Sequence, residues 1–453
     1  MRKLRLSAPD TTNSNRRKPT GETLPPKYSG RPAGEKRFFN RMNQVDRSLI
    51  EECNELLRSN SIGAGLKIRK LESHLTESFQ VPYARAVITG AAALHLILLS
   101  QDIGFGDEVI ISALSPPYLA NCIVQSGAKP ILLDVKSNGF NMDPERIEPA
   151  ITPNTRAIVV VHSGGVPSDP ETIYRIGAKH DLRIIEDASL AVGSEYKGKK
   201  IGSFGNFTYF SLSKMQKGGL CPGGVIIGAE SDAFDNIDRM LNDGIDFRTL
   251  QSAGADCEIA CCGYEYASND LAAAIFLHQF MKLEELIGAR KKHAKHYEQE
   301  LREIEGLVLP EEKPGNRNSW FNYPVIVDHT IYPLSKTDLR DYLVAENLEI
   351  ESEVIKPLHL HKYYRNRFGY SAGDFPNAEN NWNNSIFLPT NPGLKDKDIS
   401  DIVTALKRIL KYYRIQNRRR HDIGTYTDGD RIKEFAEPLH APNFGTSDNR
   451  ADY

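Results

Sequence analysis

Four side chains in this sequence could exchange protons with a substrate: Asp187, His162, Glu265 and His359. His162 directly follows the apolar run Ala157–Val161 and precedes a Ser-Gly-Gly turn, and strand ends of this kind present side chains to a cleft. Asp187 also follows a short apolar run. Both positions suit structural residues as well, a buried histidine and an aspartate that caps a turn. Where no cation lies opposite, desolvation would raise the pKa of Asp187 or Glu265 and make either a usable acid.

A second kind of chemistry is indicated between Phe210 and Gly224, where Lys214 and Lys217 flank Gln216. A lysine amine can form a Schiff base with a carbonyl carbon, whereas a glutamine amide cannot. The two lysines also suit a solvated loop, or a pair that binds the phosphate of a substrate. The stretch therefore leaves three interpretations open: a nucleophile, an anion site and a solvated loop.

Short β-branched runs alternate with segments long enough for a helix over much of the chain. Buried parallel strands joined by helical crossovers produce this pattern. We therefore expect an α/β fold with a three-layer αβα large domain, in which Phe207–Phe210 and Gly224–Ile227 form a further strand pair. The other expected strands are Ala86–Ile88, Glu108–Ile111, Pro130–Leu133, Ala157–Val161 and Leu182–Ile185.

Composition divides the chain into four expected regions. Residues 1–40 are rich in Pro, Gly, Ser, Lys and Arg, and they bury too little apolar surface to offset the entropy of ordering, so we expect a flexible basic arm. Residues 41–285 should form the large domain. Residues 286–415 should form a smaller α+β domain, joined to it by a long helical pattern from Leu271 to Ile304. Residues 416–453 are polar without clear periodicity, which predicts an extended tail.

The overall composition argues against several classes of protein. The 453 residues carry a formal net charge of −2, which favours neither nucleic acid nor an anionic membrane as a partner. The apolar run Ala92–Leu99 is too short to cross a bilayer. Six cysteines in so long a chain do not make a disulfide framework. Cys257, Cys261 and Cys262 lack a recognisable fourth ligand, so we expect no metal site and reduced thiols in a cytoplasmic protein.

Nine short motifs follow one another in order between residues 45 and 413. They are Thr89–His95, Gly106–Ile110, Gly127–Val135, Glu186–Ala188, Tyr196–Ser203, Gly263–Tyr264, Pro357–Leu360, Gly373–Pro376 and Leu388–Leu394. Together they resemble the DegT/DnrJ/EryC1/StrS family, sugar aminotransferases of fold type I that use pyridoxal phosphate. The resemblance implies that Asp187 pairs with the protonated ring nitrogen of the cofactor and that Ser211 helps to hold its phosphate. A helix that starts near Gly90 would add N–H groups and a positive dipole end.

The same resemblance implies that several cofactor contacts are replaced. Counted without gaps from Phe210 and from Gly224, the position of the family's lysine is Gln216. A carboxylate near the phosphate, as at Glu265, would be unfavourable. The other replacements are Ala91 for a hydroxyl residue at the phosphate, Pro116 for the stacking aromatic, Leu190 for a glutamine, Val192 for a histidine, and Glu265 and Ala267 for an asparagine and an arginine.

These replacements predict a protein of sugar, cyclitol or natural-product biosynthesis that has lost the Schiff-base lysine. It would act without pyridoxal phosphate in the old pocket, so we expect no cofactor, with pyridoxal phosphate possible if Lys217 substitutes. Two alternatives stay open: a working aminotransferase that uses Lys217 or Lys214, and a non-catalytic subunit of an active paralogue. We expect a small-molecule substrate. Because family active sites lie at a dimer interface, we also expect a homodimer, or a heterodimer with a paralogue.

Overall fold

The computed structural model describes residues 37–38, 47–59, 63, 65–212, 222–245, 259–346, 348–350 and 355–424. Lys214, Gln216, Lys217 and Cys257 lie outside these ranges, so the structure does not test what the sequence predicts for them.

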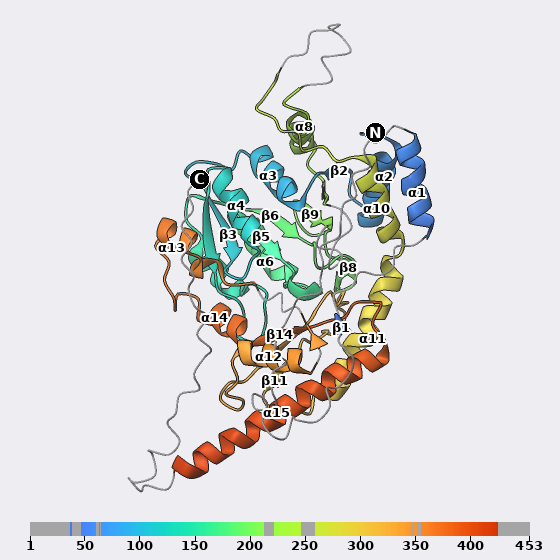
Figure 1. The fold of residues 1–453 in the computed structure, drawn as a ribbon. Helices are drawn as coiled ribbons and strands as arrows, with labels where there is room; N and C mark the ends of the chain where they lie inside the picture. The colour runs from blue at the N-terminus through green and yellow to red at the C-terminus, as the bar shows by residue number, and fades with distance from the viewer. Residues whose placement is uncertain are drawn as a thin grey trace, which may run out of the picture.

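Within the described residues, seven strands form the sheet of the large domain, in the order β2-β10-β9-β6-β5-β3-β4 (Figure 1). The run from β9 through β6, β5 and β3 to β4 is parallel, and β10 pairs antiparallel with both β9 and β2. The expected α/β class and parallel core are confirmed. The strands are β2 (Tyr83–Val87), β3 (Glu108–Ser112), β4 (Lys129–Leu133), β5 (Thr155–Val161), β6 (Arg183–Asp187), β9 (Phe207–Ser211) and β10 (Gly224–Gly228).

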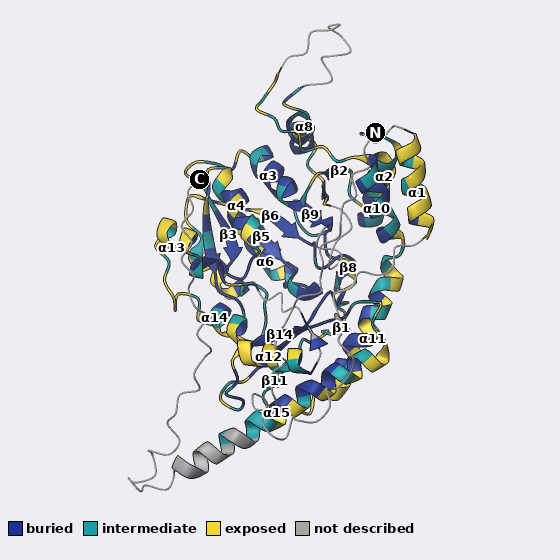
Figure 2. Cartoon of the chain, in the orientation of Figure 1, coloured by how far each residue is buried: buried dark blue, intermediate teal, exposed yellow. Residues whose placement is uncertain are grey.

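Helices cover both faces of this sheet, which gives the three layers. The strands and the inner sides of the helices are buried, whereas the outer sides are exposed (Figure 2). One face packs against α3 (Gly90–Ser100), α4 (Pro117–Gln125) and α8 (Ser231–Met240). The other packs against α2 (Leu66–Phe79), α5 (Ile147–Ala150), α6 (Pro170–His180) and α10 (Asp270–Met281).

A second hydrophobic core forms around a small antiparallel sheet, in the order β11-β12-β14. Its elements are β11 (Leu307–Val308), β12 (Tyr323–Val327), β14 (Ser385–Leu388), α11 (Leu283–Leu301), α12 (Lys336–Ala345) and α15 (Asp396–Gly424). Between α12 and β14 the chain returns to the large domain, since Leu358, Tyr364 and Ala378 join its core. These three residues belong to η4 (Leu358–Leu360), α13 (Lys362–Phe368) and α14 (Pro376–Asn383).

Short elements complete the described chain. β1 (Arg37–Phe38) pairs in parallel with β13 (Leu348–Glu349), and β7 (Glu195–Tyr196) forms a hairpin with β8 (Lys199–Lys200). The remaining helical segments are α1 (Arg47–Arg58), η2 (Pro144–Arg146) and η3 (Ser163–Gly165).

Two helices differ from the sequence prediction. The helical pattern from Leu271 to Ile304 is divided between α10 and α11, because Lys282 has φ −99° and ψ 6°, outside the helical region. α15 continues to Gly424, beyond the boundary at residue 415 that the sequence suggested.

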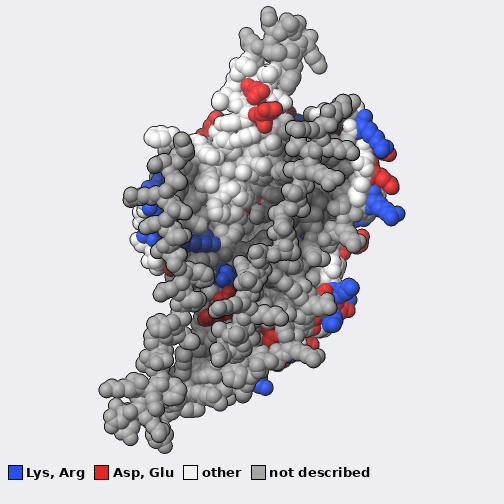
Figure 3. Space-filling model, viewed as in Figure 1, with Lys and Arg blue, Asp and Glu red and all other residues white. Residues whose placement is uncertain are grey.

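No described helix combines the length and the apolar character that a membrane crossing requires. Around α1 and α11, basic and acidic side chains are interspersed on the face shown in Figure 3. This mixed distribution agrees with the small net charge of −2.

One buried carboxylate ties two helix starts together on the back of the sheet. Asp270, the first residue of α10, is 3 % exposed. Its Oδ1 accepts the N–H groups of Gly65, Lys67 and Ile68 at 3.0, 3.2 and 3.0 Å. A negative charge at the start of α2 satisfies donors that have no partner within the helix. The contact fixes the crossing of α2 and α10.

We predict that Asp270→Asn lowers the free energy of unfolding by about 1–3 kcal/mol, because the amide removes the charge that three N–H donors share. Urea unfolding followed by circular dichroism measures the change. Asp232→Asn is the matched control, since Asp232 lies exposed in the first turn of α8 and should change stability by less than about 0.5 kcal/mol. Equal effects at the two positions would contradict a role for the buried charge.

Candidate functional site

A cavity of about 310 Å³ lies where β5 and β6 end, and residues of both domains line it. Val161 and Asp187 end the two strands, and the small domain contributes Asn322 and Phe387. Ligands of open α/β sheets bind at the carboxyl ends of the strands. Most of the wall is apolar, formed by side chains such as Leu114, Val161, Leu190, Ile355 and Phe387.

Among the described residues that line this cavity, Asp187 is the one with a carboxylate, and three donors orient it. Its Oδ1 accepts the hydroxyl of Ser189 at 2.5 Å and the N–H of Ser189 at 3.0 Å. Its Oδ2 accepts the phenol of Tyr118 at 2.5 Å. The Ser189 hydroxyl accepts in turn from the N–H of Ser211 at 2.8 Å. This chain of contacts links the ends of β6 and β9 to the carboxylate.

Tyr118 reaches Asp187 from α4, where it is the second residue after Pro116. Its hydroxyl also lies 3.5 Å from that of Tyr209, the neighbour of Asp187 across the β6–β9 pair. Burial, together with the charge of Asp187, raises the pKa of Tyr118 well above its usual value. The phenol therefore stays protonated near neutral pH and donates its hydrogen to the carboxylate.

The start of α3 lies against the end of β9. Thr89 caps the helix by accepting the N–H of Ala92 at 3.0 Å. A Cβ atom added to Gly90 would stand 2.5 Å from the Cβ of Ser211, so only glycine allows this approach. The helix start and Ser211 thus form one surface that could hold an anion. Ala91 adds no hydroxyl to it.

His162 and Glu186 form a pair without any solvent exposure. Nδ1 of His162 accepts the N–H of Ser168 at 3.0 Å, so Nε2 carries the hydrogen and faces Glu186 at 3.2 Å. Burial raises the pKa of Glu186, but donors that include His162, Tyr174 and Gly205 lower it by more, and the net shift is downward. These are the contacts of a structural pair. An acid–base role for His162 stays a prediction.

The other two acid–base candidates do not line this cavity. Glu265 is exposed, and its backbone bridges to Asn242. His359 is buried in η4, where Nε2 lies 2.8 Å from Oε1 of Glu379. Catalytic roles for both stay predictions.

The residues of the cavity wall that were not anticipated as site residues include Tyr118, Ser189 and Asn322. Ser189 stands two residues after Asp187, so a side-chain contact between them could have been proposed from the sequence. Asn322 comes from the small domain, is 1 % exposed, and its Oδ1 has no hydrogen-bond partner among the described residues. No local signal connects it with Asp187, because only the packing of the two domains brings them together.

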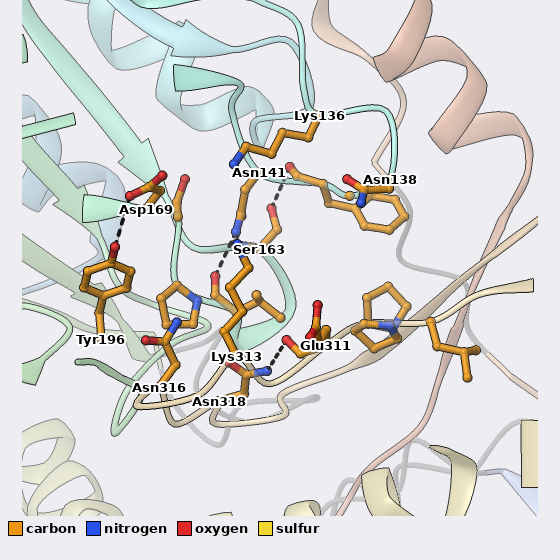
Figure 4. A pocket seen from close by; sticks show the side chains of 18 of the residues that line it. Lys136, Asn138, Asn141, Ser163, Asp169, Tyr196, Glu311, Lys313, Asn316 and Asn318 are labelled. Atoms are coloured by element: carbon orange, nitrogen blue, oxygen red, sulfur yellow. Dashed lines mark hydrogen bonds between the residues drawn. The ribbon is translucent and has the colours of Figure 1, made fainter. Parts of the chain in front are cut away.

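A second cavity, also of about 310 Å³, adjoins the first and shares Phe140 and Ser163 with it (Figure 4). It lies between the loops after β4 and β5 and the segment 308–318 of the small domain. Lys136 and Lys313 enter from opposite walls. Neither ammonium group lies within 4 Å of a carboxylate in the part of the chain that the structure describes. Amide side chains such as Asn138 and Asn316 also line the space.

Comparison with known proteins identifies the family. Residues 43–407 match the model of the DegT/DnrJ/EryC1/StrS aminotransferase family. The chain belongs to this family. It is 33 % identical over 371 residues to the spore coat polysaccharide biosynthesis protein SpsC of Bacillus subtilis, covering 81 % of this chain and 95 % of that protein. It is 35 % identical over 367 residues to the uncharacterized protein MJ1066 of Methanocaldococcus jannaschii, covering 80 % of this chain and 95 % of MJ1066.

Solved structures of aminotransferases share the fold. Helicobacter pylori PseC, an aminotransferase involved in the biosynthesis of pseudoaminic acid, superposes with a TM-score of 0.77 at 22 % identity, covering 84 % of this chain and all of PseC. A Streptococcus pneumoniae protein with a provisional assignment as a sugar aminotransferase, in its PMP form, gives a TM-score of 0.75 at 24 % identity, covering 82 % and 98 %. The fold-type-I architecture that the sequence predicted is confirmed.

The expectation that no cofactor is bound is wrong. The chain belongs to an aminotransferase family, and the S. pneumoniae neighbour was solved in both PLP and PMP forms. A member of the DegT/DnrJ/EryC1/StrS family is therefore expected to use pyridoxal phosphate. Replaced contacts predicted the absence of a cofactor, yet Asp187 lines the cavity and α3 begins at Gly90, as a bound pyridoxal phosphate would require. Loss of the reactive lysine stays a prediction, since Gln216 lies outside the described residues.

The residues present fit this cofactor at both of its ends. Asp187 offers a buried, oriented carboxylate to a ring nitrogen, and the start of α3 with Ser211 offers N–H groups to a phosphate. Pro116 lines the cavity. The resemblance places it where the family has an aromatic side chain, so the cofactor ring would meet a smaller apolar surface there.

No group of three or more His, Cys, Asp or Glu side chains that could hold a metal occurs within the described residues. Cys122, Cys261 and Cys262 are free thiols.

We predict that His162→Ala lowers the free energy of unfolding by about 1–3 kcal/mol, because it leaves Glu186 and the N–H of Ser168 with fewer buried partners. Cofactor affinity, measured by titration with pyridoxal phosphate, should change less than about twofold because the ring does not line the cavity. His180→Ala is the matched control, since His180 pairs with Glu148 at the surface. Unchanged stability with altered cofactor binding would instead place His162 in the site.

Proposed function

We propose that this protein is a pyridoxal-phosphate-dependent aminotransferase that acts on a sugar in polysaccharide biosynthesis. The observation that carries the proposal is the Asp187 carboxylate, oriented by Ser189 in a cavity at the carboxyl edge of the sheet. The biological setting rests on the similarity to the spore coat polysaccharide biosynthesis protein SpsC.

When bound, pyridoxal phosphate accepts an amino group from a donor and transfers it to a carbonyl carbon. Asp187 would hold the proton on the ring nitrogen, because a buried carboxylate favours the protonated form of a partner base. Ser189 keeps the carboxylate in place. The apolar wall formed by Leu114, Leu190 and Phe387 excludes water from the reacting atoms.

The adjoining cavity suits the non-reacting part of a sugar substrate. It opens beside the first cavity at Phe140 and Ser163. Asn138 and Asn316 present amide groups that can bond to hydroxyls, and Lys136 and Lys313 can pair with a phosphate carried by the sugar. A ligand that spans both cavities would be held by both domains.

We propose Lys217 as the amine that anchors the cofactor, with Lys214 as the alternative, because Gln216 stands at the position of the family's lysine. Lys217 is adjacent to that position in the sequence. A shift of one residue within the loop would bring it to the cofactor aldehyde.

A second candidate follows from Gln216 itself. An amide cannot form the covalent anchor, so the cofactor could be held by non-covalent contacts alone, in its amine form. This version keeps the roles of Asp187 and the α3 start, and it differs in having no lysine joined to the cofactor.

One experiment separates the two versions. The full-length protein is incubated with pyridoxal phosphate, the absorption spectrum is recorded, and borohydride is added before peptide mass spectrometry. We predict a reduced cofactor on Lys217, which Lys217→Ala abolishes and Lys214→Ala does not. Gln216→Lys is the positive control, because it restores an amine at the family position and should be labelled there.

Binding without any labelled lysine in the wild type, but with labelling of Gln216→Lys, would support the non-covalent version. Absence of binding in the wild type and in all variants would overturn the proposed function and favour a non-catalytic subunit.

We further propose a homodimer in which Glu265 lies near the site of the partner subunit, as expected from the family position that it occupies. Light scattering on the purified protein should give about twice the mass of 50.7 kDa. Glu265→Asn should then tighten cofactor binding severalfold, because it removes a carboxylate from the surroundings of a phosphate. A monomeric protein, or unchanged affinity, would contradict this placement.

A further inference from the structure

We propose that the phenol of Tyr118 occupies the hydrogen-bonding position on Asp187 that the ring nitrogen of the cofactor takes. Tyr118 would then compete with the cofactor, and it would turn away from Asp187 when the cofactor binds. The inference rests on the proposed function, because it concerns the same site.

The Asp187 carboxylate has few acceptor positions left for a cofactor. A carboxylate oxygen accepts about two hydrogen bonds. Both positions of Oδ1 are taken by Ser189, through its hydroxyl and its N–H. Oδ2 remains, and the Tyr118 hydroxyl lies 2.5 Å from it. Oδ2 is the oxygen left to a ring N–H that enters the cavity. Tyr118 lines that same cavity, so the phenol stands where the ring would approach this oxygen, and the two donors compete for it.

The contact between the phenol and Oδ2 is a strong one. A hydrogen bond to an ionised oxygen is shorter and stronger than one between neutral groups. Tyr118 has a further neighbour in the hydroxyl of Tyr209, at 3.5 Å. Because the phenol stays protonated near neutral pH, the cofactor meets a donor that is already in place and must displace it.

The position of the Tyr118 ring also favours competition. Tyr118 and Pro116 line the same cavity as Asp187. The family's stacking aromatic is expected at residue 116, and here the aromatic ring stands two residues later and reaches the carboxylate. An aromatic ring with a hydrogen-bond donor at its edge thus faces Asp187 from the protein itself, as the cofactor ring would.

Two states follow, one with the phenol on Asp187 and one with the oxygen free. The apparent dissociation constant of the cofactor equals the intrinsic constant divided by the fraction of protein in the free state. Removing the hydroxyl or the ring raises that fraction and tightens binding. In the absence of cofactor, Tyr118 also supplies a partner for a carboxylate that would otherwise be buried with one oxygen unbonded.

The test measures affinity without any covalent step. Full-length wild type, Tyr118→Phe and Tyr118→Ala are titrated calorimetrically with pyridoxine 5′-phosphate, which has a ring nitrogen and a phosphate but no aldehyde. Both variants should bind at least about tenfold more tightly than the wild type. Tyr174→Phe is the matched control, because Tyr174 donates to Glu186, the neighbouring carboxylate on β6, and it should change affinity less than about twofold.

The outcomes separate this inference from the proposed function. Equal affinity of the wild type and both Tyr118 variants, or weaker binding by the variants, would overturn the inference and leave the cofactor site standing. Absence of binding by every protein would overturn both. Thermal unfolding of each variant shows that it is folded, and the two substitutions at residue 118 give independent measurements if one of them destabilises the chain.

Discussion

The arrangement of the site depends on one carboxylate, that of Asp187, held at the end of a buried parallel strand. Burial of a charged group is unfavourable unless donors surround it, and here the donors come from three parts of the chain. Ser189 belongs to the turn that follows the strand, Tyr118 to α4, and Ser211, which bonds to Ser189, to β9. The charge therefore fixes the positions of the elements around it, and the cavity forms where they meet.

The neighbouring carboxylate on the same strand, that of Glu186, packs in the interior and does not face the cavity. Glu186 precedes Asp187, and alternate side chains of a strand point to opposite faces of the sheet. Glu186 bonds to His162, Tyr174 and the N–H of Gly205 on the face of the sheet that α6 covers. The alternation of the strand thus directs Glu186 into the packed interior and Asp187 to the cavity, where the proposed function assigns it to the cofactor.

Family membership and the details of the site give different information. The chain belongs to an aminotransferase family, which makes pyridoxal phosphate the expected cofactor. Asp187 in the cavity wall and the start of α3 fit that cofactor. The resemblance places Gln216 and Pro116 where the family has a lysine and an aromatic ring, at positions that would touch the cofactor. A protein can keep a cofactor while the strength and the manner of its binding change, since each contact contributes separately to affinity.

The order of short apolar runs and family motifs was enough to predict the fold class, the parallel core and the place of Asp187, because strand periodicity and chain order are local properties. The sequence also assigned Gly90 and Ser211 to the same expected phosphate site, but it did not predict how closely they pack. Tertiary structure alone decided that His162 bonds to Glu186 and not toward the cavity, that Asn322 reaches the cavity, and that Tyr118 bonds to Asp187. These contacts join residues that lie far apart in the chain, and only the packing of helices and domains around the sheet brings them within hydrogen-bonding distance.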